Sequence, residues 1–248
     1  MAESFRADTT LARVTRWLYP PQCCLCGALT ADDGHLCGSC WRDMPFLSGL
    51  GCDACGASLP GARDDGVHFC DDCMTMARPW SRGRAALSYR DRGRHVVLAL
   101  KHGDRLDLTR PAAAWMATAG RDLLKEAALL LPVPIARGRL FRRKYNQAAE
   151  LSRALSRVTG VACCPDALER TQATRPQDGM DFAARFRNVE NVIRVAPDRM
   201  ERVKGGKIVL IDDVMTSGAT LSACAGPLIE AGAVTVDVLV LARVEKTP

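Results

Sequence analysis

The sequence predicts an α/β protein in which a cysteine-rich N-terminal region precedes a domain with a parallel β-sheet. Nine of the 12 cysteines lie within the first 73 residues, and eight of these form four C-x-x-C pairs. From about residue 80 onward, β-rich apolar runs alternate with segments of helical periodicity. Strands that alternate with helices form parallel sheets, whose ligand sites lie at the carboxyl ends of the strands. A third feature, the segment 209–220, indicates where one such site lies.

Composition divides the chain into three segments. Residues 1–21 predict a short amphipathic helix that Pro20 and Pro21 end, residues 22–77 hold the paired cysteines, and residues 80–248 form the α/β domain. No apolar run approaches the roughly 18 residues that a membrane span needs. The N-terminus also lacks the apolar stretch of a signal peptide. We therefore expect a cytoplasmic protein without membrane insertion.

Periodicity places the elements of the α/β domain. β-rich runs predict strands over residues 84–89, 129–134, 207–211 and 234–242. Apolar stripes predict helices over residues 95–100, 111–125, 146–158 and 217–230. In the last helix the apolar residues follow the i, i+3, i+4, i+7 spacing, and Gly232 marks its end. Strands and helices therefore alternate through most of the domain.

Four C-x-x-C pairs, separated by 10, 11 and 14 residues, predict a double zinc ribbon. A C-x-x-C turn brings two thiolates to one zinc, and two such turns complete a tetrahedral site. In the simplest, sequential arrangement the ligands are Cys23, Cys26, Cys37 and Cys40, followed by Cys52, Cys55, Cys70 and Cys73. The alternatives are a cross-braced pairing, or a ligand from Cys24, His35 or His68.

Residues 209–220 have the pattern of a strand, a loop and a helix N-terminus, which together form an anion site. An apolar run ends in Asp212 and Asp213, and a loop of small and hydroxyl residues leads into the helix. The unpaired N–H groups of a first helical turn favour an anion, and Gly218 lets the backbone approach it. Because carboxylates do not bind phosphate, the two acids suit vicinal ribose hydroxyls of the same ligand, with or without a divalent cation. An ordinary βα connection is the alternative.

This segment resembles the 5-phosphoribosyl-1-pyrophosphate (PRPP) loop of type I phosphoribosyltransferases. The resemblance implies a phosphoribosyltransferase-like (Rossmann-like) domain, in which the two acids hold the ribose hydroxyls and the loop cradles the 5-phosphate. It also implies Mg²⁺, bound together with PRPP. The ligand-binding residues expected on this basis are Asp212, Asp213, Val214, Met215, Thr216, Ser217, Gly218, Ala219 and Thr220, together with Arg137.

A basic loop follows the predicted strand 129–134. Residues 137–144 include five basic side chains, among them Arg143 and Lys144. In a phosphoribosyltransferase the loop after this strand contacts the pyrophosphate, and cations suit a leaving group with several negative charges. We therefore predict that Arg143 and Lys144 act as catalytic residues together with Asp212 and Asp213. A solvated basic loop is the alternative.

The whole chain resembles the ComF family, including its GntX-like members, which join a double zinc ribbon to a phosphoribosyltransferase-like domain. The resemblance rests on the four C-x-x-C pairs, on Gln177, and on residues 101–103, 132–134, 143–147, 185–188 and 209–220. The family usually has Gly where this chain has Lys144, so the local loop geometry differs in backbone freedom. For Asn146 the alternative to a functional role is a helix cap.

Charge is distributed unevenly along the chain. Residues 1–80 carry 6 Lys and Arg against 10 Asp and Glu, a balance of −4, whereas residues 81–248 carry 28 against 18, or +10. We therefore expect the ribbons to serve as a scaffold or to dock competence-machinery proteins, and single-stranded DNA, if bound, to contact the C-terminal domain in a salt-dependent way. A basic cluster belongs either to such a surface or to a solvated face; it comprises Arg78, Arg82, Arg84, Arg90, Arg92 and Arg94.

Two functions agree with these features. The first is an enzyme that transfers phosphoribose from PRPP to an acceptor, with inversion at the anomeric carbon, as the resemblance implies. The second is a non-catalytic module that binds PRPP or a nucleotide and aids the handling of single-stranded DNA, because ComF-type proteins are linked to natural transformation. No residue in the sequence identifies the acceptor.

We predict about two zinc ions per chain, each bound by thiolates and not by histidine, because the cysteine pairs complete two four-thiolate sites. Metal analysis by inductively coupled plasma mass spectrometry measures the stoichiometry, and thiol titration after chelation measures the free cysteines. Fewer than about one zinc per chain, or eight of the cysteines recovered as disulfides, contradicts the prediction.

Overall fold

The computed structural model describes residues 16–62, 64–102, 104–136, 138, 140, 144–172, 182–189 and 191–245. The chain forms two compact units, Met1–Asp43 and Met44–Pro248. In the smaller unit, residues 16–18 are helical, and the rest of the predicted N-terminal helix before them lies outside the described residues. This unit also contains the short helix α2 (Gly38–Arg42).

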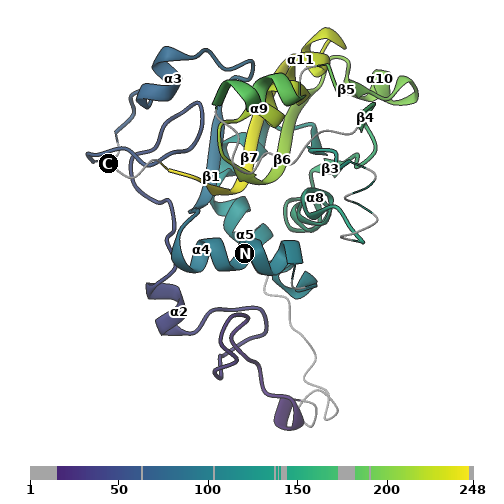
Figure 1. The fold of residues 1–248 in the computed structure, drawn as a ribbon. Helices are drawn as coiled ribbons and strands as arrows, with labels where there is room; N and C mark the ends of the chain where they lie inside the picture. Colours follow the sequence, from purple (N-terminus) through teal and green to yellow (C-terminus); the bar gives the residue numbers. More distant parts are fainter. Residues whose placement is uncertain are drawn as a thin grey trace. The chain divides into compact units, whose positions relative to one another are not determined.

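The larger unit is built on a five-stranded parallel sheet, as the alternation of strands and helices predicts (Figure 1). Its strands, in spatial order, are β1 (Gly83–Ser88), β7 (Thr235–Arg243), β6 (Lys207–Met215), β2 (Leu129–Pro132) and β3 (Ala162–Cys163). All four pairings are parallel. The fold class predicted from the sequence, an α/β domain with a parallel sheet, is therefore confirmed.

The central strands β6 and β7 are almost continuously apolar because both faces of the sheet are covered. Alternate residues point to opposite faces, so Ile208 and Leu210 enter one core while Val209 and Ile211 face the other side. The first core includes α11 (Ala219–Glu230), and α9 (Phe182–Val189) packs against this helix. The helix that follows β6, α11, therefore lies on one side of the sheet, and the helix that follows β2, described next, lies on the other.

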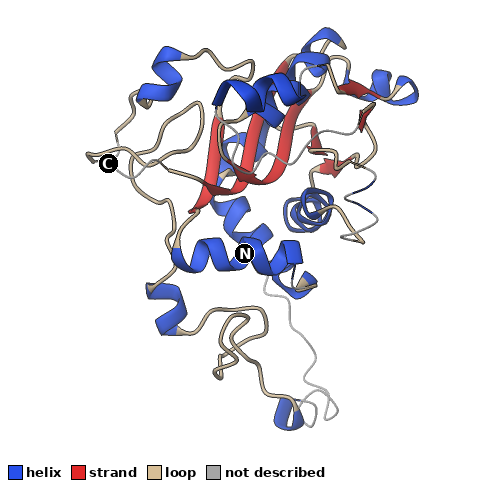
Figure 2. Cartoon of the chain, viewed as in Figure 1, coloured by secondary structure: helices blue, strands red, loops and turns tan. Residues whose placement is uncertain are grey.

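The other face carries α4 (Asp91–His102), α5 (Thr109–Ala119) and α8 (Gln147–Thr159), which pack on the sheet strands (Figure 2). The single helix predicted over residues 111–125 is in fact two, α5 and α6 (Arg121–Glu126). The break falls at Gly120, where a Cβ would lie 2.7 Å from the Leu239 side chain. A larger residue at this position would displace the Leu239 side chain of β7.

Several short elements escaped the periodicity analysis because two to five residues carry too little pattern. β4 (Leu168–Arg170) and β5 (Ile193–Val195) form a separate antiparallel pair. The others are α3 (Asp71–Thr75), η1 (Leu106–Leu108), η2 (Pro197–Arg199) and α10 (Met200–Val203). No helix in the described ranges is both long and apolar enough to cross a membrane.

The second cysteine-rich segment belongs to the larger unit and covers its β1 edge. Leu47 donates its N–H to Ala86 at 3.0 Å, and Gly83 donates its N–H to Asp53 at 2.6 Å. Gly56, with a φ of +70°, lies so close that a Cβ would sit 2.6 Å from the Ala85 nitrogen. The core of this segment and the core of the sheet are continuous. A strand edge that would otherwise expose unpaired backbone groups is therefore protected.

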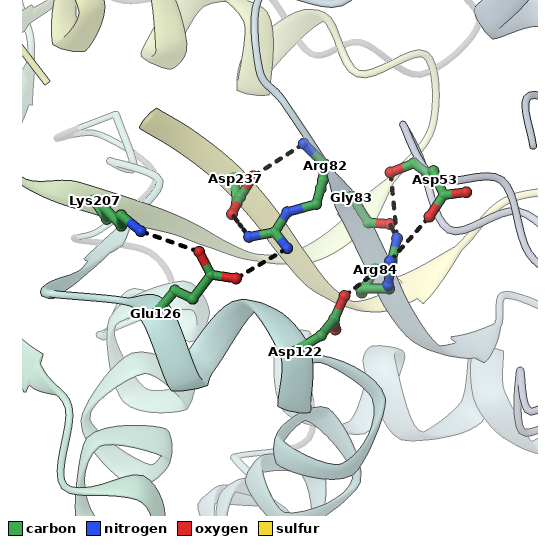
Figure 3. A network of polar contacts seen from close by, with 8 residues as sticks. All are labelled: Asp53, Arg82, Gly83, Arg84, Asp122, Glu126, Lys207 and Asp237. Atoms are coloured by element: carbon green, nitrogen blue, oxygen red, sulfur yellow. Dashed lines mark hydrogen bonds and ion pairs between the residues drawn. The ribbon is translucent and has the colours of Figure 1, made fainter. Parts of the chain in front are cut away.

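A network of ion pairs lies at the amino-terminal ends of the strands (Figure 3). Arg82 pairs with Asp237 at 2.9 Å and with Glu126 at 3.4 Å. Arg84 pairs with Asp53 at 3.0 Å and with Asp122 at 2.9 Å. These two members of the basic cluster are thus neutralised inside the fold, which argues against their binding nucleic-acid phosphates.

We predict that the two thiol clusters contribute unequally to the stability of the sheet. Cys52→Ser should lower the unfolding free energy of the larger unit by about 3 kcal/mol or more, because Cys52 lies in the core shared with the sheet. Cys26→Ser, in the smaller unit, should change it by less than about 0.5 kcal/mol. Urea unfolding, together with hydrogen exchange of the β6 and β7 amides, measures the change in unfolding free energy for each variant. Equal losses of unfolding free energy in the two variants contradict the prediction.

Candidate functional site

The eight cysteines of the C-x-x-C pairs form two four-thiol clusters, in the sequential grouping predicted. Within each cluster the four Sγ atoms all lie within 4.8 Å of one another. In the smaller unit Cys26 and Cys37 are 3.6 Å apart, and in the larger unit Cys55 and Cys70 are 3.7 Å apart. Four thiols at this spacing match the tetrahedral ligand set of zinc. The clusters therefore fit two structural zinc sites.

The alternative ligands lie outside both clusters. Cys24 donates its backbone N–H to the carbonyl of His35 at 3.1 Å, and the His68 ring hydrogen-bonds to Asp64 at 2.7 Å. Within the first cluster, the Ser39 hydroxyl lowers the pKa of Cys37 to about 6, while burial raises the pKa of Cys40 to about 12. Such opposite shifts are typical of close thiols that do not all ionise together unless a cation joins them.

The anion-site segment connects β6 to α11 at the carboxyl edge of the sheet. β6 continues through both acids to Met215, and α11 begins at Ala219, two residues later than predicted. Gly218 causes the delay because it has a left-handed φ of +83°. A Cβ there would lie 3.0 Å from both Arg78 and Trp80, so only glycine fits. We call residues 215–218 the loop.

Two arginines hold the carbonyl side of the loop. Arg243 Nη1 donates to the carbonyls of Met215 at 3.2 Å and Thr216 at 2.7 Å, and Arg78 Nη1 donates to the carbonyl of Ser217 at 2.7 Å. In a trans peptide the C=O and the N–H point in opposite directions. The three N–H groups in the same peptide units, those of residues 216–218, therefore point away from the arginines. Successive amides turned to one side form an anion-binding nest.

The two acids stand beside this nest in different electrostatic environments. Lys101, in the last turn of α4, places its Nζ 3.1 Å from Asp213 Oδ1. Asp212 accepts the backbone N–H of Asp213 at 2.8 Å. Burial raises the pKa of Asp212 to about 7, the charge of Asp213 adds to the rise, and Lys101 opposes it. Asp212 thus changes charge near neutral pH.

Of the predicted basic residues, Lys144 is described, whereas Arg137 and Arg143 lie outside the described residues. Lys144 is 75% exposed and its Nζ is 3.5 Å from Asp104. Its φ is +66°, a left-handed conformation that glycine adopts freely and that lysine adopts at a cost of about 1 kcal/mol. The backbone at Lys144 thus has a conformation that suits glycine.

Asn146 has the capping role. Its Oδ1 accepts the N–H of Ala148 at 3.1 Å, and its Nδ2 donates to the carbonyl of Val133 at 3.0 Å. The side chain therefore starts α8 and ties it to the chain that leaves β2. These two hydrogen bonds fix the backbone at Asn146, just after the basic loop of residues 137–144.

A cavity of about 460 Å³ opens beyond the carboxyl end of β2, and Pro134, Asn146 and Arg170 are among its lining residues. Arg170 Nε donates to the carbonyl of Pro134 at 3.2 Å. The charge of Arg170 also lowers the pKa of Asp212, against the effect of burial. The cavity lies where the helices after β2 and β6 go to opposite faces, the usual ligand position in such sheets.

Sequence reasoning missed three residues that surround the acids and the loop. Arg78 was assigned only to a basic cluster, and Lys101 only to the family pattern. Arg243 had no assignment, although a charge that ends an apolar run is a signal, and it is 4% exposed. Their roles depend on contacts between segments up to 139 residues apart, as between Arg78 and Ser217.

Residues 14–74 match the family model of the double zinc ribbon domain. The DNA utilization protein YhgH of Escherichia coli O6:H1 is 30% identical over 232 residues, which cover 90% of this chain and 97% of that protein. Competence protein F of Haemophilus influenzae is 27% identical over 222 residues, covering 88% and 94%. Competence protein ComFC of Bacillus subtilis is 25% identical over 212 residues, covering 82% of each.

Two thiol clusters and a parallel sheet with a loop at its carboxyl edge define a protein that combines a double zinc ribbon with an α/β domain. The similarity to the E. coli relative runs through both parts. The chain belongs to the ComF family.

Two solved structures align with part of the chain. The allosteric regulatory enzyme of purine biosynthesis is 19% identical with a TM-score of 0.39, over 58% of this chain and 30% of its own. The glutamine PRPP amidotransferase of B. subtilis is 18% identical with a TM-score of 0.35, over 57% of this chain and 30% of its own. The chain thus spans less than a third of the length of either.

We predict that Asp212→Asn stabilises the fold in a pH-dependent way. Because the folded-state pKa of Asp212 is about 7 and the ordinary value is 3.8, the folded state binds more protons between these values. The wild type therefore loses stability as pH rises from about 4 to about 7, and the uncharged variant does not. We expect the variant to gain about 1–3 kcal/mol at pH 8 and little at pH 4.

Urea unfolding at both pH values measures this difference. Asp237→Asn is the matched control, because Asp237 is buried against Arg82 and its loss should destabilise the fold at both pH values. A gain for Asp212→Asn of the same size at pH 4 and pH 8 contradicts the assigned pKa.

Proposed function

We propose that this chain binds PRPP with Mg²⁺ at residues 212–220 and transfers its phosphoribosyl group to an acceptor. The observation that carries the proposal is the direction of the loop. Two arginines hold its carbonyls, so the amides of residues 216–218 face the ligand side next to two carboxylates. This combination suits a phosphate and vicinal hydroxyls of one molecule.

The 5-phosphate would accept hydrogen bonds from the loop amides and from the hydroxyls of Thr216 and Thr220. Asp212 and Asp213 would accept the ribose hydroxyls, and Lys101 would hold Asp213 in place from the other side. Asp212 and Asp213 would also suit Mg²⁺, which prefers oxygen ligands and would supply positive charge to offset the diphosphate. The ionised form of Asp212 accepts a hydroxyl better, so PRPP affinity should rise with pH through about 7.

The cavity beyond β2 would take the pyrophosphate and the acceptor. Breaking the bond between the anomeric carbon and pyrophosphate leaves an oxocarbenium-like ribose and a leaving group with growing negative charge. Lys144 and Arg170 border the cavity, and Arg137 and Arg143 belong to the same basic loop in the sequence. Cations at this position stabilise the transition state more than the ground state. The acceptor would attack from the opposite face, which inverts the anomeric carbon.

A non-catalytic role is the second candidate, and the names of the relatives favour it. They are a DNA utilization protein and two competence proteins. In this role PRPP binding would accompany the handling of single-stranded DNA by the larger unit. Each phosphate contact would then steepen the decline of log affinity with log salt by roughly 0.7.

We predict that the double variant Asp212→Asn, Asp213→Asn loses at least about 100-fold in PRPP affinity at pH 8 with Mg²⁺ and remains folded. Isothermal titration calorimetry measures the affinity, and circular dichroism measures the fold. Asp122→Asn is the control, because Asp122 lies at the opposite edge of the sheet and should leave the affinity unchanged. If the double variant binds PRPP as the wild type does, the site assignment is wrong.

A pyrophosphate-release assay separates the two candidates. The protein is incubated with PRPP, Mg²⁺ and a panel of bases and amines, and pyrophosphate is measured for each acceptor. Release that requires a particular acceptor supports transfer. Calorimetric binding of PRPP without release supports the non-catalytic role.

A further inference from the structure

The two arginines that hold the loop also touch the second thiol cluster. Arg243 lies within reach of the Cys55 thiol. Arg78 lies within reach of the Cys73 thiol in the same cluster. Each guanidinium thus lies between a cysteine of the cluster and a carbonyl of the loop.

Packing holds both arginines in these positions. Arg243 is 4% exposed, and Arg78 lies 5.5 Å above the ring of Trp80. Trp80 in turn donates its Nε1–H to the carbonyl of Ala54 at 2.6 Å, between the first two cysteines of the cluster. The Nε atoms of both arginines are buried and have no hydrogen-bond acceptor among the described residues. A buried N–H in this situation needs an anionic neighbour to offset its desolvation.

A zinc ion with four thiolates supplies such an anion. Four thiolates around a divalent ion leave a formal charge of −2, which matches the two guanidinium charges of Arg78 and Arg243. Without the ion the four thiols are no longer held together, so the turn of residues 52–55, which accepts the Trp80 N–H, is free to shift together with the ring that lies under Arg78. The guanidinium of Arg78 would move with the ring, and the carbonyl of Ser217 would lose its donor.

We propose that Arg78 and Arg243 are positioning residues that couple zinc at the cluster Cys52, Cys55, Cys70 and Cys73 to the conformation of the loop, and hence to ligand binding there. The placement of the loop by this cluster stands on contacts alone, whereas the effect on ligand binding rests on the proposed function. Coupling is reciprocal, so zinc favours PRPP binding and PRPP retains zinc by the same factor. This role is assigned to the cluster of the larger unit, whose Cys52 and Cys55 lie in the core shared with the sheet.

The first test does not depend on PRPP. Hydrogen exchange of the full-length, zinc-loaded protein is compared for the wild type, Arg78→Gln and Arg84→Gln. Arg84 is the matched control, because it contacts the second ribbon through Asp53 but not the loop (Figure 3). Exchange of amides 216–222 should rise about 10-fold in Arg78→Gln and stay unchanged in Arg84→Gln. Amides 208–211 of β6 serve as an internal reference. Arg78→Lys should show the same increased exchange as Arg78→Gln, because lysine lacks the planar guanidinium group and its several donors.

The second test measures the coupling. Native mass spectrometry follows the loss of zinc to the chelator TPEN with and without PRPP and Mg²⁺. PRPP should slow the loss of one of the two ions about 10-fold in the wild type and in Cys26→Ser, and less than about 2-fold in Arg78→Gln. Arg243→Gln is the second variant. If Arg243→Gln does not fold, Arg78→Gln still tests the coupling, because Arg78 is only half-buried and its replacement should leave the fold intact.

The outcomes separate this inference from the proposed function. If calorimetry shows no PRPP binding to the wild type, the proposed function fails, and the exchange of the loop amides alone decides the inference. If PRPP binds but zinc is lost at the same rate with and without it, the coupling is overturned. Loop exchange in Arg78→Gln that equals the wild type overturns the positioning role.

Discussion

The carbonyls of residues 215–217 accept hydrogen bonds from Arg243 and Arg78, and this contact sets the direction of the ligand-facing backbone. Without it, the peptide units between β6 and α11 would be free to turn. Arg243 reaches the loop because it ends β7, whose register places it opposite Met215. Arg78 reaches it because the chain passes along the second thiol cluster before it enters β1. The sheet and the ribbon therefore position the same loop.

The two edges of the sheet treat charge differently. At the amino-terminal edge each acid has a basic partner: Asp237 and Glu126 pair with Arg82, and Glu126 also pairs with Lys207. At the carboxyl edge, Asp212 is half-buried beside the buried acid Asp213, and its pKa rises to about 7. Such a group destabilises the folded state when it ionises. Its burial is understandable if a ligand supplies the compensating hydroxyls or cation, because functional sites commonly trade stability for binding.

Long, strongly patterned features could be predicted from the sequence. The thiol spacing gave both four-thiol clusters, and the apolar runs gave four of the five strands of the main sheet. β3, β4 and β5 are two or three residues long, too short for a period to emerge. The break at Gly120 depends on Leu239, more than 100 residues away, which no local pattern contains. For the same reason the carboxylates were found from their motif, whereas Lys101, Arg78 and Arg243 required the folded chain.

The two ribbons share a sequence pattern but not a physical role, and their glycines show why. Gly27 and Gly56 both follow the second cysteine of a pair and have φ angles of +76° and +70°. A Cβ on Gly27 would meet only the end of the Gln22 side chain, at 4.0 Å, whereas one on Gly56 would collide with the backbone of Arg84 and Ala85. The first glycine is required by its turn alone. The second is also required by the sheet, because this ribbon covers the β1 edge. A repeated motif thus fixes the metal site, and its neighbours decide whether that site also supports the ligand-binding domain.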